Sequence, residues 1–144
     1  MQIRSGDNRV QIAVAERIPP ELPRAGDLKL TVHVLSQGFT GCGSAWVAAD
    51  AFTVFLKELT QLEIRREGVA RLESMSPGEF MIELRPIDGW GHIAIFGLLS
   101  KLCYVDAGPP QRNGIHFAFG LNPTLVPWFV AQFRALLKDP IMPD

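Results

Sequence analysis

Apolar and polar residues alternate along several stretches of this chain, and a period of two residues predicts β-strands. From 8 to 17, the large apolar residues between Val10 and Val14 occupy every second position. The segment 18–27 contains three prolines and a glycine, which break a strand, and the alternation resumes over 28–34. Because only one phase of each strand is apolar, one face of the sheet is expected to contact the core and the other to contact water.

Two later segments change to a spacing of three and four residues, which is typical of amphipathic helices. The first follows a short predicted strand at 44–47, has Asp50 as its predicted N-cap and ends near Arg66. Its apolar stripe consists of Phe52, Phe55, Leu56, Leu59 and Leu62. The second helix is expected from about Thr124, its predicted N-cap, to Leu137.

The chain between these helices predicts an antiparallel meander of four strands over 69–121. Turns are expected at 76–78 and 88–89, and the longer irregular segment 102–113 is either an extended strand end or a functional loop. The order is therefore three strands, a helix, four strands and a helix, without an internal repeat. It predicts one α+β domain over 1–144, with two helices packed on one face of a single antiparallel sheet of about seven strands.

The composition is that of a globular domain with an ample core, since 47% of the 144 residues are hydrophobic. Fourteen Lys and Arg against fifteen Asp and Glu give a net charge of −1, which offers no basic field for nucleic acid. The polar N-terminus and the lack of an apolar run of about 20 residues predict a cytoplasmic protein without a signal peptide or membrane span. The two cysteines, Cys42 and Cys103, are expected to be reduced thiols.

Three histidines, His33, His92 and His116, fall on the outward phase of their predicted strands. If those strands were neighbours in register, the imidazoles could bind a metal ion, but no HxH or HExxH pair supports this alternative, and no cofactor is expected. Cys42 could be a nucleophile with a histidine as its base, although a small buried residue is the more frequent role of cysteine. The glycines between 38 and 43 are expected in flexible turns.

Aromatic residues separate into core and surface candidates. Seven phenylalanines lie on inward phases and are expected in the core: Phe52, Phe55, Phe80, Phe117, Phe119, Phe129 and Phe133. Trp90 lies in the predicted turn 88–91, where a large side chain is expected to be partly exposed and available as an interface anchor. The segment 102–113, which contains Asp106, is a second candidate contact region. The candidate interface residues are therefore Trp90, His33, His92, His116 and Asp106.

The whole pattern resembles the small WapI-like immunity proteins of bacterial polymorphic toxin systems. The residues that carry the resemblance are Trp46 and Val47 leading into Phe52, Phe55 and 56–59, then 68–72, then 91–93, and finally 117–119 before Leu125 and the closing helix. The resemblance implies a binder that blocks a cognate toxin, often a nuclease. A charge mimic of nucleic acid is not expected, because residues 1–72 hold nine basic and eight acidic groups, and residues 73–144 hold five and seven.

The sequence thus favours a non-enzymatic cytoplasmic protein-binding domain, and specifically an immunity protein whose partner is a cognate toxin. The exposed sheet face or the loops near Trp90 and 102–113 would carry the contact. One alternative is an enzyme that uses a small ligand or a metal ion bound by the three histidines. Another is a homodimer in which two sheets pair edge to edge or face to face.

Overall fold

The computed structural model describes residues 1–138; the last six residues of the predicted domain 1–144 lie outside the described part. The elements in chain order are β1 (Gln2–Ser5), β2 (Asn8–Arg17), β3 (Leu28–Ser36), β4 (Phe39–Val47), α1 (Ala49–Arg65), β5 (Ala70–Glu73), β6 (Phe80–Pro86), β7 (Ile93–Cys103), β8 (Gln111–Leu121), the short 3-10 helix η1 (Pro123–Leu125) and α2 (Val126–Leu136). Four strands followed by a helix therefore occur twice, although the sequence shows no repeat.

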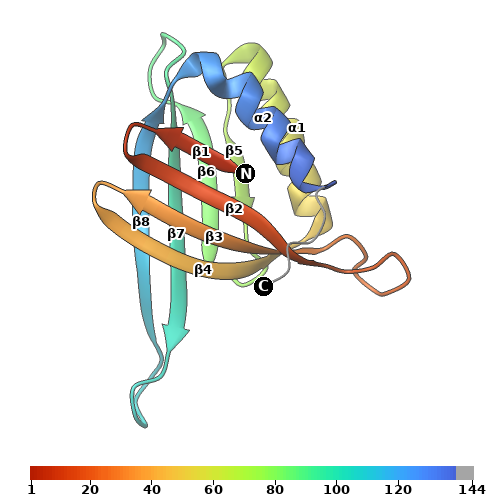
Figure 1. Ribbon diagram of the computed structural model, residues 1–144, viewed down its shortest axis with the longest axis vertical. Helices are drawn as coiled ribbons and strands as arrows, with labels where there is room; N and C mark the ends of the chain where they lie inside the picture. The colour runs from red at the N-terminus through yellow and green to blue at the C-terminus, as the bar shows by residue number, and fades with distance from the viewer. Residues whose placement is uncertain (139–144) are drawn as a thin grey trace.

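The strands form two antiparallel sheets, ordered β1-β2-β3-β4 and β5-β6-β7-β8. The predicted α+β class with two helices is confirmed, whereas the single sheet of about seven strands is wrong. Helix α1 separates β4 from β5, and the strands of the first sheet cross those of the second at a steep angle (Figure 1). Hydrophobic alternation identifies the face of a strand that contacts the core but not its hydrogen-bonding neighbours, so it cannot reveal this division.

The apolar faces of both sheets and both helices enclose one buried cluster. Helix α1 contacts β5 and lies beside α2 (Figure 1), and the ring of Phe55 contacts the ring of Phe133 edge to face at a centroid distance of 5.0 Å. The seven phenylalanines predicted in the core are all buried. Neither helix has the length and apolar character needed to span a membrane within the part of the chain that the structure describes.

Both helices begin differently from the sequence prediction. The buried carboxylate of Asp27 accepts a hydrogen bond of 2.9 Å from the backbone N–H of Ala49, at the start of α1, and Asp50 already lies in the first turn. At the second helix, the side chain of Asn122 accepts bonds from the backbone N–H and the hydroxyl of Thr124, at 3.0 and 2.8 Å. Asn122 therefore caps η1, the single turn that leads into α2, and Thr124 is not the N-cap of α2.

Two glycines of β4 allow the sheets to cross closely. A Cβ atom at Gly41 would lie 2.7 Å from Cγ2 of Ile115, and one at Gly43 would lie 3.2 Å from Cδ1 of Leu99. The expected flexible turn is therefore wrong for these two residues, which belong to a paired strand. Gly38, with φ +83°, does occupy the turn between β3 and β4.

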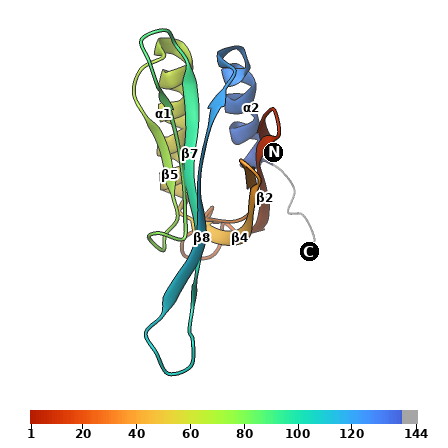
Figure 2. The ribbon, with the colours of Figure 1, turned by 90° about the vertical axis from the view of Figure 1, so that its left-hand side faces the viewer.

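The β7–β8 hairpin extends beyond the rest of the molecule (Figure 1, Figure 2). Strand pairing continues as far as Cys103 opposite Gln111, so much of the segment 102–113 is extended strand. We call residues 101–113 the arm. Its exposed apolar side chains are Leu102, Tyr104 and Val105.

Candidate functional site

The structure places the three histidines in three separate positions. His33 lies on β3 in the first sheet, His116 on β8 in the second sheet, and His92 in the loop before β7. The alternative in which the three imidazoles meet required neighbouring strands of one sheet, and β3 and β8 belong to different sheets. Within residues 1–138, no group of three or more His, Cys, Asp or Glu side chains could hold a metal ion.

His33 has a different neighbour, Cys42. The two residues are opposite each other on β3 and β4, and the Cys42 Sγ atom lies 3.7 Å from His33 Nε2. Cys42 is exposed, so the expected burial of this residue is wrong. A thiol beside an imidazole is the pair needed for nucleophilic catalysis. Here it stands on the outward side of a sheet, in a shallow hollow that Arg9 and Gln11 also line.

Trp90 lies in a loop held by Asp88. One carboxylate oxygen, Asp88 Oδ1, accepts hydrogen bonds from the backbone N–H groups of Trp90 at 2.8 Å and His92 at 3.3 Å. The other, Oδ2, lies 2.5 Å from His92 Nδ1. The hydrogen bond with the His92 side chain, supported by the two backbone N–H groups, lowers the pKa of Asp88 below its ordinary value. The Trp90 side chain is 88% exposed, as the sequence predicts, and this small network fixes the backbone that carries it.

Other exposed apolar side chains lie at the same end of the second sheet as Trp90. The segments 64–69, 87–92 and 122–128 all lie at this end (Figure 1, Figure 2). We define the apolar end as Ile64, Val69, Ile87, Trp90, Leu125 and Trp128, each of which is exposed. Concentrated exposed apolar side chains mark interaction surfaces more often than isolated ones do.

The arm lies at the opposite end of the same sheet. Trp90 precedes the eleven residues of β7, whereas Asp106 follows them in the tip of the arm. At about 3.3 Å per residue, the two loops are about 33 Å apart. The two candidate contact regions of the sequence therefore cannot form one compact site, and Asp106 and Trp90 do not come together.

No family model, curated protein or solved structure matches this chain. The resemblance to WapI-like immunity proteins therefore stays a prediction.

Proposed function

We propose that this chain is a non-enzymatic protein-binding domain that acts in the cytoplasm as an immunity protein, neutralising a cognate bacterial toxin by binding it. The observation that carries the proposal is Trp90, a large side chain that is 88% exposed on a loop fixed by Asp88. Tryptophan is among the residues that most often dominate the binding energy of protein interfaces. The sequence resemblance to immunity proteins points to the same class of partner.

The apolar end is suited to a partner that presents an apolar surface. Its exposed side chains are apolar, and the chain as a whole has a net charge of −1, so affinity would come from apolar burial around Trp90. The Asp88 network holds the loop backbone before binding, which reduces the entropy lost when a partner fixes it. Removal of such an anchor typically costs about 2–4 kcal/mol of binding free energy.

The experiment first asks whether a toxin-like reading frame neighbours the gene of this chain. Its purified product is then titrated with the wild-type chain and with Trp90→Ala by isothermal titration calorimetry. The wild-type chain should bind it, and Trp90→Ala should weaken binding by at least tenfold. Leu22→Ala is the matched control, because Leu22 is also an exposed apolar residue, 51% exposed, on the distant loop between β2 and β3. An unchanged affinity of Trp90→Ala would refute the role of the apolar end.

A second copy of the chain is the competing occupant of this surface. Light scattering over a range of protein concentrations distinguishes the two occupants. A monomer at all concentrations excludes a second copy of the chain as the occupant of this surface. If the chain forms a dimer that Trp90→Ala dissociates, the partner of this surface is a second copy of the chain and not a toxin.

A further inference from the structure

A pocket at the base of the arm lies away from the apolar end, and its chemistry is different. It has a volume of about 460 Å³, within the range of small-molecule sites. Three parts of the chain line it: β4, the turn between β5 and β6, and the arm. The lining residues are Ser44, Ser76, Glu79, Lys101, Leu102 and Arg112.

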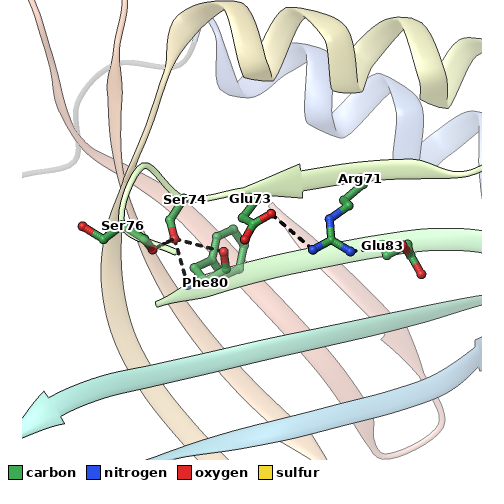
Figure 3. Close-up of polar contacts among 6 residues, drawn as sticks. All are labelled: Arg71, Glu73, Ser74, Ser76, Phe80 and Glu83. Carbon is green, nitrogen blue, oxygen red and sulfur yellow. Dashed lines mark hydrogen bonds and ion pairs between the residues drawn. The ribbon is translucent and has the colours of Figure 1, made fainter. Parts of the chain in front are cut away.

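One wall of this pocket is a turn fixed by internal hydrogen bonds (Figure 3). The Ser74 hydroxyl donates to the carbonyl oxygen of Ser76 at 2.7 Å and also contacts the carbonyl oxygen of Phe80 at 3.1 Å. The backbone N–H of Phe80 donates back to the same hydroxyl at 3.0 Å. Ser76 and Glu79 are thus carried by a turn that does not need to be ordered by a ligand.

Arg112 crosses from the arm to this turn. Its Nη2 atom donates to the Pro77 carbonyl oxygen at 3.2 Å, and Nη1 donates to the Ser100 hydroxyl at 3.1 Å. A Cβ atom at Gly78 would lie only 3.3 Å from the guanidinium carbon, and Gly78 has φ +81°. Both hydrogen-bond acceptors of Arg112, the Pro77 carbonyl and the Ser100 hydroxyl, are neutral oxygens. Arg112 is therefore held in place by neutral oxygens, forms no ion pair with a carboxylate among residues 1–138 and has further N–H donors available.

Lys101 supplies a second unpaired cation. Its Cε atom lies 3.4 Å from the position of a Cβ at Gly43, so the aliphatic stem rests on β4 where that strand has no side chain. No ion pair joins Lys101 or Glu79 to another group in the described part of the chain. Elsewhere, Arg71 and Arg85 are both paired with Glu83 on the outward face of the second sheet, at 3.5 and 3.2 Å.

We propose that this pocket binds the carboxylate of a small organic acid that carries one negative charge. Arg112 would bind the two carboxylate oxygens through its planar fork, and the Ser44 hydroxyl would donate a further hydrogen bond. The pocket contains two cations, Arg112 and Lys101, and one acidic residue, Glu79, so a ligand with a single negative charge makes its total charge zero. The second negative charge of a phosphate would be repelled by Glu79. Leu102 gives the ligand an apolar wall. This site is independent of the proposed immunity function.

The test is a titration of the isotope-labelled protein with sodium butyrate, a monoanion with a short apolar tail, monitored by backbone amide shifts. Sodium chloride at equal ionic strength and inorganic phosphate are titrated in parallel. Amides of Gly78, Lys101 and Arg112 should shift with butyrate and saturate, with a dissociation constant in the millimolar range, since exposed ion pairs are weak. Shifts that do not saturate, that chloride reproduces, or that phosphate produces at lower concentration would overturn the proposal.

Substitutions of Arg112 and Lys101 measure the contribution of each cation to butyrate binding. Arg112→Gln should weaken butyrate binding at least fivefold, and Arg112→Lys should restore only part of it because lysine lacks the fork. Lys101→Ala keeps every hydrogen bond of the turn, so it tests the site even if Arg112→Gln disturbs folding. It should lower the affinity for butyrate twofold to fivefold. The control is Lys57→Ala, an exposed lysine on α1 far from the pocket. Equal affinity in Lys101→Ala and Lys57→Ala would contradict the assignment.

Discussion

Gly97 offers a sharp test of the packing between β7 and β8. It lies opposite Phe117 in the antiparallel register, and a Cβ atom at Gly97 would be 2.0 Å from Cζ of that ring and 2.5 Å from Cε1. Non-bonded carbon atoms normally lie about 3.5–4.0 Å apart, so the ring or the strand would have to move by about 1.5 Å. The ring is buried, at 5% exposure, and β7 is hydrogen-bonded on both sides, so neither can move freely.

Gly97→Ala should therefore lower the free energy of unfolding by about 2–3 kcal/mol, near the upper part of the usual cost of overpacking. The smaller chain entropy of alanine in the unfolded state offsets only about 0.5–1 kcal/mol of the clash. Urea unfolding followed by tryptophan fluorescence measures the change, provided that the slope with urea concentration stays constant. The matched control is Gly120→Ala on β8, where an added Cβ meets no atom within 4 Å; it should change stability by less than about 0.5 kcal/mol.

A double-mutant cycle identifies the cause. If the Phe117 ring is the obstacle, Gly97→Ala should cost less than about 1 kcal/mol in a Phe117→Leu background, so the two changes should be strongly coupled. Equal costs in the two backgrounds would refute the steric argument. The argument would also be refuted if Gly97→Ala lowered the free energy of unfolding by less than about 0.5 kcal/mol in the wild-type background.

Two further predictions concern the crossing of the sheets and the Trp90 loop. Gly41→Ala places a Cβ 2.7 Å from Ile115 Cγ2 and should destabilise the fold by about 1–2 kcal/mol in urea unfolding; an Ile115→Ala background should remove most of this cost. The second prediction follows from the pKa of Asp88, which is lowered from 3.8: the ordering of the Trp90 loop should be complete above that pH and be lost as the pH falls through the lower folded-state pKa. The backbone amide shift of Trp90 reports this transition, and a midpoint at or above pH 3.8 would contradict the Asp88 network.

The sequence by itself determined most of the local elements, although it missed β1 and the first part of β4. The strand predicted over 8–17 is β2 with the same bounds, and the helical spacing from Phe52 to Leu62 is the buried stripe of α1. Such patterns are readable because the period of a strand or helix is set by neighbouring residues. The exposure of Trp90 is likewise local, since it follows from an Asp-Gly turn closed by Asp88.

Only the tertiary structure decided which strands pair, and this pairing in turn decides which candidate site residues come together. The alternation that marks His33 and His116 as outward-facing is the same whether they share a sheet or, as here, belong to two sheets. The contact of Arg112 with the carbonyl oxygen of Pro77 joins residues 35 positions apart. No local period encodes such contacts, because they depend on how the two sheets cross, and that crossing depends on packing around Gly41 and Gly43.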